Sequence, residues 1–203
     1  MSIPFQGSET AKNLLRAFAG ESQARNRYDF AANLCQKQEL QAMAFIFQAT
    51  AKQEQAHAKV FWDHLQALNG QNLPIYGAYP IEGTNRILEL LRAAQHNEHE
   101  EHGSVYPSFA AIATQEGFPE AAASFRQIAA IEQLHGERFG LLADQLESGA
   151  LFVSQIETGW MCLNCGHTQN SLEAPKQCPV CNHGQGWFIR LELAPWSPVV
   201  KQT

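Results

Sequence analysis

The segments Glu54-Gln-Ala-His57 and Glu132-Gln-Leu-His135 each place a glutamate and a histidine three positions apart. On a helix, this spacing puts both side chains on one face, one turn from each other. A further glutamate precedes each pair at nearly the same distance, 33 positions in the case of Glu21 and 34 in the case of Glu98. The chain therefore carries one chemical pattern twice. Two such pairs with two lone glutamates are the ligand set of di-iron and di-manganese carboxylate bundles.

The segments around these residues show the period of a helix, with core-like positions in steps of three and four. In each segment a glutamate or histidine interrupts the apolar stripe midway, and the stripe then resumes. If four helices pack by these stripes, the interruptions meet at one level of the core. The four stripes are Leu14, Phe18, Glu21, Arg25, Tyr28 and Ala32; Met43, Phe47, Thr50, Glu54, His57, Phe61, His64 and Leu68; Ile87, Leu91, Ala94, Glu98, Glu101, Val105, Ser108 and Ile112; and Ala121, Phe125, Ile128, Glu132, His135, Phe139, Leu142 and Leu146.

Five ionised glutamates at one level of a dry core would repel one another and lose their hydration, at a cost of many kcal/mol. Besides the candidate ligands, the stripes hold only two basic side chains, Arg25 and His64. Two divalent cations would nearly neutralise the cluster, so the pattern predicts a dinuclear metal site. Carboxylates with two imidazoles favour iron or manganese over a structural zinc. The alternative is that each pair lies on an ordinary solvated helix face.

Four of the five cysteines form two C-x-x-C motifs, Cys162-Leu-Asn-Cys165 and Cys178-Pro-Val-Cys181, with twelve residues between them. Four thiolates at this spacing predict a tetrahedral site for zinc or iron. Disulfides are the weaker alternative, because we expect no secretory signal and the fifth cysteine, Cys35, has no evident mate. We expect Cys35 to fill a helix position.

The cysteines lie in a region that differs in composition from the helical stripes. Strand-forming residues run from Phe152 to Ile156 and again from Trp187 to Leu191, and glycines and prolines punctuate the rest. So small and apolar-poor a region needs a metal for stability. We expect Trp160, Trp187 and Phe188 to pack around the four-thiolate centre.

On these residues the chain resembles the rubrerythrin family over essentially its full length. The resemblance implies an all-α, ferritin-like four-helix bundle in residues 1–150 and a small rubredoxin-like β/loop metal domain in residues 151–203. One departure is Asn182, which stands where free-standing rubredoxins usually have glycine. The matching motifs are Gly20–Tyr28, Glu54-x-x-His57, Glu98-x-x-Glu101 followed by Tyr106-Pro107, Glu132-x-x-His135, and Cys162, Cys165, Cys178 and Cys181.

The resemblance also implies a role for each ligand. Glu54 and Glu132 would bridge two irons, and Glu21 would bind one iron terminally. Glu98 and His135 would bind the other iron. A third iron would occupy the four-cysteine site, where zinc could substitute.

Four residues are implied to take part in catalysis. Glu101 and His57 would exchange on one iron as its oxidation state changes, since ferric iron prefers the anionic oxygen. Tyr28 and Tyr106 would hydrogen-bond to ligand carboxylates. For each tyrosine, plain core packing is the alternative.

The function expected from this resemblance is that of a peroxidase that reduces hydrogen peroxide to water and protects against oxidative stress. Electrons would pass through the four-cysteine iron. The chain has no Gly-x-Gly-x-x-Gly fingerprint, so a separate NAD(P)H-dependent reductase or a small electron carrier would supply them. The alternatives are a ferroxidase that handles iron and a binding module with zinc in its knuckles. A homodimer is expected from the family.

Bulk properties exclude several other classes of function. The net charge of −6 and the lack of a basic run argue against a nucleic-acid partner. No apolar run approaches the ~20 residues of a membrane span. No charged-then-apolar segment precedes Ser8, so we expect a cytoplasmic protein. Residues 69–83 are rich in glycine and proline and too long for a tight hairpin, which predicts a crossover between the second and third helices.

Overall fold

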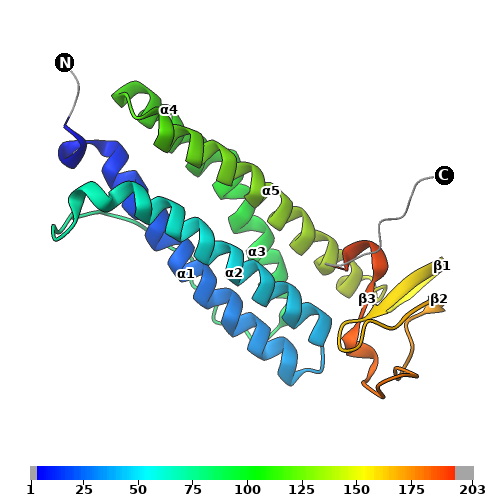
Figure 1. Ribbon diagram of the computed structural model, residues 1–203. Coiled ribbons are helices and arrows are strands. Elements are labelled where there is room, and N and C mark those ends of the chain that lie inside the picture. The colour runs from blue at the N-terminus through cyan, green and yellow to red at the C-terminus, as the bar shows by residue number, and fades with distance from the viewer. Residues whose placement is uncertain (1–3, 195–203) are drawn as a thin grey trace.

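The computed structural model describes residues 4–194 and consists of a long helical bundle with a small sheet at one end (Figure 1). A five-residue π-helical segment, η3 (Glu101–Val105), joins α3 to α4, so the two together form the third helix of the bundle. The α-helices are α1 (Glu9–Lys37), α2 (Gln41–His64), α3 (Ile87–Glu100), α4 (Tyr106–Glu116) and α5 (Pro119–Glu147), and the short 3-10 helices are η1 (Phe5–Gly7), η2 (Leu65–Leu68), η4 (Gln185–Trp187) and η5 (Leu191–Leu193).

Local sequence explains where the helices begin and end. Ser8 caps α1, and its hydroxyl accepts a hydrogen bond from the amide of Ala11 at 3.0 Å. Gly117 ends α4 in the left-handed conformation, and Pro119 opens α5 in its first turn, where a missing amide hydrogen costs nothing. These short-range signals set the lengths over which the stripes can pack.

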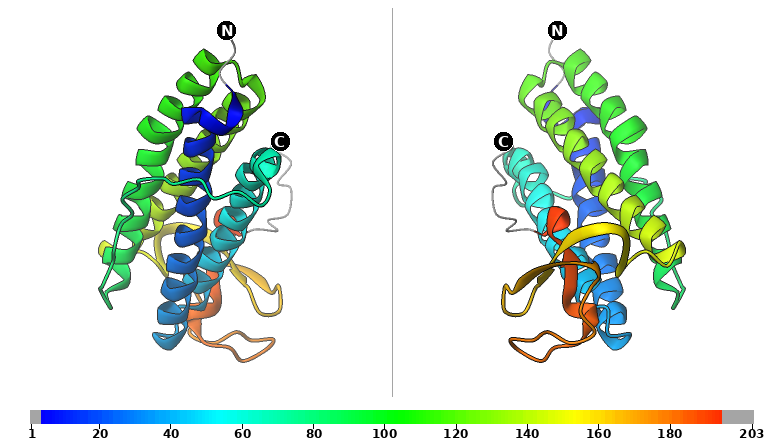
Figure 2. Two further views of the ribbon diagram at one scale, coloured as in Figure 1. Left: turned by 90° about the vertical axis from the view of Figure 1, so that its left-hand side faces the viewer. Right: turned by 90° about the vertical axis from the view of Figure 1, so that its right-hand side faces the viewer.

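The segment between η2 and α3 is an extended crossover, as the sequence predicts. It has no helix or strand from Asn69 to Arg86 and runs beside α1 (Figure 2). The guanidinium Nε of Arg16 donates to the carbonyl of Tyr76 at 2.9 Å, and the hydroxyl of Tyr79 donates to the carbonyl of Arg16 at 3.0 Å. Further along, Arg27 forms an ion pair with Glu82 at 2.8 Å. The crossover is therefore attached to α1 along its length.

The four stripes meet in the core, and the six glutamate and histidine side chains of the two repeats are buried at one level. An apolar cluster lies on each side of that level. One includes Phe47 and Phe139, and the other includes Phe61 and Phe125. The expectation that carboxylates interrupt a dry core is confirmed for Glu21, Glu54, Glu98 and Glu132, whereas the fifth glutamate, Glu101, is partly exposed.

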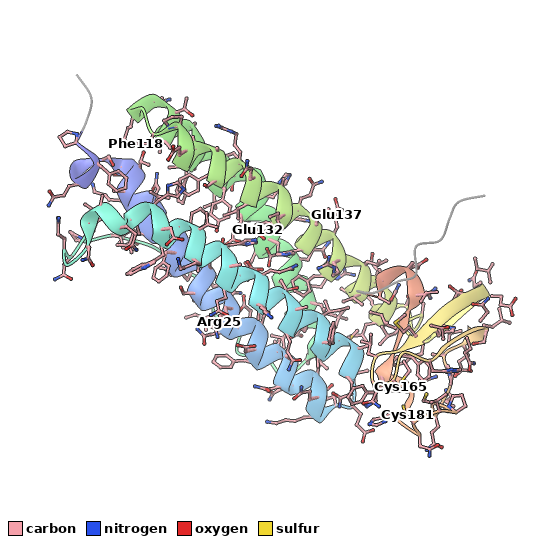
Figure 3. The ribbon with its side chains drawn as sticks, viewed as in Figure 1. Arg25, Phe118, Glu132, Glu137, Cys165 and Cys181 are labelled. Carbon is pink, nitrogen blue, oxygen red and sulfur yellow. The ribbon has the colours of Figure 1, made fainter. Side chains whose placement is uncertain are left out.

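Two of the predicted stripe positions are wrong. Arg25 is exposed on the outside of α1 (Figure 3), because the buried position in that turn belongs to Ala24. In the third helix, Ser108 is exposed, and the core is formed by Tyr106, Ala110 and Ala113. The π-helical segment adds a residue to one turn, so the buried face shifts in register after Glu101. A prediction that assumes a constant helical period cannot anticipate this shift.

The C-terminal unit is a three-stranded antiparallel sheet in the order β2-β1-β3. Its strands are β1 (Val153–Cys162), β2 (Thr168–Glu173) and β3 (Phe188–Arg190). Met161 and Ile189 belong to the same apolar cluster as Phe47 and Phe139, so the sheet packs on the end of the bundle. The division at residues 150 and 151 stays a prediction, and residues 195–203 of the second predicted domain lie outside the described residues.

Candidate metal centres

The two Glu-x-x-His pairs and their lone glutamates converge in the middle of the bundle. They form two overlapping groups, Glu21, Glu54, His57 and Glu132, and Glu54, Glu98, Glu132 and His135, and within each group one ligand atom from every residue lies within 4.8 Å of all the others. All six side chains are at most 7% exposed. Each of the four helices of the bundle contributes at least one of them.

Glu54 and Glu132 belong to both groups because each directs its two oxygens to different histidines. Glu54 Oε2 lies 3.2 Å from Nδ1 of His57, and Glu54 Oε1 lies 3.0 Å from Nδ1 of His135. Glu132 Oε1 lies 2.9 Å from Nδ1 of His57, and Glu132 Oε2 lies 2.8 Å from Nδ1 of His135. The pair of carboxylates therefore spans two ligand sets related by an approximate two-fold symmetry.

The remaining glutamates complete one set each. Glu21 Oε2 lies 3.8 Å from Nδ1 of His57, and Glu98 Oε2 lies 3.7 Å from Nδ1 of His135. Gly136 helps to bring α3 to α5 at this level, because a Cβ built there would lie only 3.3 Å from Cβ of Glu98. Each histidine thus faces three carboxylates.

The buried atoms of this cluster fit metal ions better than they fit one another. Within the described part of the chain, no hydrogen bond reaches one oxygen each of Glu21, Glu54 and Glu98, both oxygens of Glu132, or Nδ1 of His135. Burying such groups without a hydrogen bond costs about 1–3 kcal/mol each. Two cations would give all of these atoms a ligand role and offset the negative charge. The donor set of carboxylates and imidazoles suits iron or manganese.

Tyr28 and Tyr106 hold the outer carboxylates, as predicted. The hydroxyl of Tyr28 donates to Glu98 Oε1, and that of Tyr106 donates to Glu21 Oε1. Both tyrosines are fully buried, and burial together with the nearby carboxylates raises their pKa well above the usual value. They are therefore fixed hydrogen-bond donors that orient the carboxylates of Glu98 and Glu21.

Glu101 lies outside both ligand groups. It is the first residue of the π-helical segment, which begins immediately after α3, and it is partly exposed. π-helical segments of this kind occur frequently at functional sites. In this structure His57 stands among the ligands and Glu101 stands aside, at the wall of a pocket that also contains Tyr106.

Without metal, the cluster has strongly shifted proton affinities. Burial and the charge of Glu54 raise the pKa of Glu98 to about 8, and burial with the charge of Glu98 raises that of Glu101. Burial opposes the charging of His57 and His135, but contacts with Glu132 and the other carboxylates outweigh it and raise both pKa values to about 12. The metal-free protein therefore holds protons in the places where cations would bind.

Sequence reasoning missed two residues beside the cluster. Gln53 Oε1 accepts a hydrogen bond from Nε2 of His135 at 2.9 Å, although Gln53 lies off the apolar stripe. Arg27, rather than Arg25, is the partly buried arginine near the site. Neither carries a sequence signal of its own, because polar residues adjacent to a stripe are common on solvated helix faces.

The four cysteines converge in the unit at one end of the molecule, where Figure 3 labels Cys165 and Cys181. Their sulfur atoms lie within 4.8 Å of one another, with 3.7 Å between the sulfurs of Cys162 and Cys181 and between those of Cys165 and Cys178. The residues expected to pack around them do so, since Trp160 and Phe188 are buried in one cluster with Cys162 and Cys178, and Trp187 packs against it. Four unpaired thiols at this separation fit a tetrahedral metal.

The two knuckles have the same backbone fold. The amide of Cys162 donates to the carbonyl of His167, and the amide of Cys178 donates to that of His183, both at 2.8 Å. Gly166 and Asn182 occupy the same place in the two turns, with φ of +76° and +61°. Asparagine is one of the few residues other than glycine that adopt this conformation readily. The departure at Asn182 therefore leaves the site intact.

Comparisons with known proteins agree with this geometry. Residues 12–143 match the family described as Rubrerythrin, and residues 160–189 match the description "Rubrerythrin, rubredoxin-like domain". The chain belongs to the rubrerythrin family. It is 44% identical over 188 residues to a rubrerythrin of Porphyromonas gingivalis, which covers 93% of this chain and 92% of that protein. A rubrerythrin of Nitratidesulfovibrio vulgaris is 40% identical over 93% of this chain and 97% of its own length.

Family membership identifies the two clusters. The bundle cluster is the di-iron site of a rubrerythrin, and the four cysteines are its rubredoxin-like metal site. Solved structures share the fold: nigerythrin in a mixed-valence state has a TM-score of 0.60 at 24% identity and covers 94% of this chain and 88% of that one. Bacterioferritin BfrA of Mycobacterium tuberculosis has a TM-score of 0.61 at 17% identity, covering 73% of this chain and 90% of that one. Within residues 4–194, no helix is long and apolar enough to cross a membrane.

Proposed function

We propose that this protein is a peroxidase that reduces hydrogen peroxide to water and thereby protects against oxidative stress. The reaction takes two electrons and two protons and cleaves the O–O bond, so that one peroxide gives two waters. The observation that carries the proposal is the presence of both centres in one chain, a carboxylate–histidine site in the bundle and a four-thiolate site packed on its end. When bound, two ferrous ions would supply one electron each to the peroxide, and the four-thiolate iron would restore them.

We assign the bridging role to Glu54 and Glu132, because each presents one oxygen to either histidine. Glu21 with His57 would serve one metal, and Glu98 with His135 the other. Tyr28 and Tyr106 would keep the outer glutamates oriented through their hydroxyl groups. Such outer hydrogen bonds hold ligand geometry in place during turnover.

Glu101 and His57 would exchange as ligands when the oxidation state changes. His57 lies among the ligand atoms, whereas Glu101 lies next to them on a π-helical turn. Because burial and Glu98 raise its pKa, Glu101 holds a proton more readily than an ordinary carboxyl. It is therefore suited to carry a proton to the departing oxygen before it becomes a ligand. Structures of the oxidised and reduced protein without a ligand change at these residues would contradict the exchange.

The four-cysteine site would receive electrons from another protein. Cys165 is exposed and Cys181 is partly exposed, so an electron donor can approach this end of the molecule closely. A separate NAD(P)H-dependent reductase or a small electron carrier in the cytoplasm fits this requirement. We also propose a homodimer as the working assembly.

A ferroxidase that handles iron is the second candidate, favoured by the shared fold with bacterioferritin. An iron-storing protein would have no evident use for the four-thiolate site. A zinc-bearing structural module is the third candidate. It would leave the second centre without a role in electron transfer.

Purified protein with measured metal content distinguishes these functions. A ferric four-thiolate site gives a red protein, whereas zinc at full occupancy leaves this site colourless. Steady consumption of hydrogen peroxide with a reductase and NADH, faster than that of dioxygen, supports the peroxidase. The variant Cys178→Ser should lose this turnover, and Cys35→Ala, at a cysteine that belongs to neither ligand group, serves as its control. Faster consumption of dioxygen than of peroxide would instead identify a ferroxidase.

A further inference from the structure

A pocket of about 270 Å³ lies between α1, the crossover and the π-helical segment. Its inner wall includes Glu101 and Tyr106, and its outer wall includes Gly77 and Tyr79 from the crossover. Among the residues proposed to bind or exchange at the bundle centre, Glu101 is partly exposed, whereas Glu21, Glu54, His57, Glu98, Glu132 and His135 are buried. The pocket therefore reaches the metal centre at its accessible side.

The inner wall connects directly to the ligands. Tyr106 donates its hydroxyl hydrogen to Glu21, and Gly20, which also lines the pocket, precedes Glu21 in the chain. A Cβ built on Gly20 would lie 3.9 Å from Glu101 Oε1. A molecule in this pocket would thus be next to the carboxyl that we propose as the proton carrier.

Tyr79 occupies the other side of the same space. A Cβ on Gly20 would lie 3.7 Å from the ring of Tyr79, so the ring and the Glu101 carboxyl flank one glycine. A Cβ on Gly77 would lie 3.0–3.2 Å from the ring and hydroxyl of Tyr79. The glycines leave room for the ring, which lines the pocket between the crossover and α1.

The crossover is held in this position by polar contacts on either side of the pocket. The hydroxyl of Tyr79 donates to the carbonyl of Arg16 at 3.0 Å, and Arg16 donates to the carbonyl of Tyr76 at 2.9 Å. On the other side, Glu82 accepts from Arg27 at 2.8 Å and from Asn97 at 3.0 Å. These hydrogen bonds hold the crossover against α1 and α3 on both sides of the pocket.

We propose that this pocket is the entrance through which a peroxide reaches Glu101, and that Tyr79 is a specificity-determining residue that limits the size of the hydroperoxide admitted. The inference rests on the proposed peroxidase function. In the reaction, ROOH with two electrons and two protons gives ROH and water, and only the O–O bond breaks. Hydrogen peroxide, in which R is a hydrogen atom, passes the ring of Tyr79, whereas a hydroperoxide with a bulky aromatic R does not.

The experiment compares Tyr79→Ala with two controls on the iron-loaded full-length protein. Tyr79→Phe keeps the ring, and Tyr76→Ala removes a tyrosine from the same crossover that is 85% exposed and does not line the pocket. The first measurement is the association rate of azide with the oxidised protein, followed by absorbance. The second is the ratio of kcat/KM for cumene hydroperoxide to kcat/KM for hydrogen peroxide.

Tyr79→Ala should raise the ratio by about ten-fold or more, as steric restriction in a pocket commonly does, and should accelerate azide association. Tyr76→Ala should resemble the wild type, and Tyr79→Phe should keep the wild-type ratio because it keeps the ring and loses only the hydroxyl contact with Arg16. Equal azide association rates and equal kcat/KM ratios in Tyr79→Ala and wild type would contradict the proposal that this pocket is the entrance. The same increase of both quantities in Tyr76→Ala would also contradict it. If the wild type reduces no peroxide, the proposed function fails, and the azide association rates alone then test whether the pocket is an entrance to the metal centre.

Discussion

Gly186 lies against the carbonyl oxygen of Glu39, so closely that a Cβ built on the glycine would be 1.7 Å from that oxygen. Gly186 belongs to η4, just before the last strand of the sheet, and Glu39 forms the left-handed turn between α1 and α2. Two main chains meet here without an intervening side chain. The contact fixes how the four-cysteine unit sits on the bundle.

Replacing Gly186 with alanine should weaken the packing of the four-cysteine unit on the bundle. A backbone oxygen cannot rotate away, so the chain must shift, which costs about 1–3 kcal/mol for an overpacked contact. Urea unfolding of Gly186→Ala should therefore give a lower free energy of unfolding than the wild type. Gly184→Ala is the matched control, because a Cβ there meets nothing within 4 Å. Equal stability of the two variants would show that this contact is adaptable.

The hydroxyl groups of Tyr28 and Tyr106 should matter for metal affinity. Tyr28→Phe removes the donor to Glu98, and Tyr106→Phe removes the donor to Glu21. Loss of such outer contacts typically weakens metal binding about 10–100-fold. Competition with a chelator measures the affinity, and Tyr76→Phe on the exposed crossover is the control. Unchanged affinity in both buried variants would support the alternative that these tyrosines only pack.

The metal-free protein should become less stable as the pH rises from 5 to 8. Glu98 has a pKa raised from 4.5 to about 8, so across this window the folded state keeps a proton that the unfolded state releases. His57 and His135 have pKa values raised from 6.5 to about 12, so their stabilising contribution is complete below pH 6.5 and declines above it. The titration of Glu98 and that of the two histidines therefore both lower the free energy of unfolding as the pH rises.

The urea midpoint of the chelator-treated protein at pH 5, 6.5 and 8 measures this dependence. Metal binding should reverse the trend, because its ligands must release their protons and the affinity rises with pH. A midpoint that rises with pH in the absence of metal would show that the carboxyls of the cluster are already ionised without it.

Replacement of Asn182 by glycine should leave the four-cysteine site stable, whereas replacement by alanine should destabilise it. Its φ of +61° costs a residue with an ordinary Cβ roughly 1–2 kcal/mol. Asn182→Gly should therefore retain the metal at least as well as the wild type, whereas Asn182→Ala should lose it faster. The rate at which a chelator bleaches the iron form measures the difference. Identical rates for the two variants would mean that this turn relaxes without cost.

Much of the site could be predicted from the sequence because its signals are local. The three-residue spacing of Glu54 and His57 puts them on one helical face, whatever surrounds that helix. The two-residue gap between Cys162 and Cys165 likewise defines a knuckle on its own. Burial of the carboxylates followed from the apolar residues before and after them. These features depend on periods and spacings that a linear chain displays directly.

The mistakes at Arg25 and Ser108 have a different origin. Each was placed by continuing a fixed helical period, and each is exposed in the structure. The π-helical turn at Glu101 breaks that period, and nothing in Glu101–Val105 indicates it locally. Which face of a helix is buried depends on the helices that pack against it, so small errors of phase are corrected only by contacts.

The sequence by itself determined the chemistry of this protein: which residues bind metal, on which helices and in which knuckles. It did so because ligands of one centre recur at spacings set by the helix and the turn. Only the tertiary structure decided that Glu54 and Glu132 span both ligand sets, that His57 rather than Glu101 lies among them, and that Tyr79 and Glu101 line one pocket. Those relationships join residues from segments far apart in the chain, and their distances follow from packing.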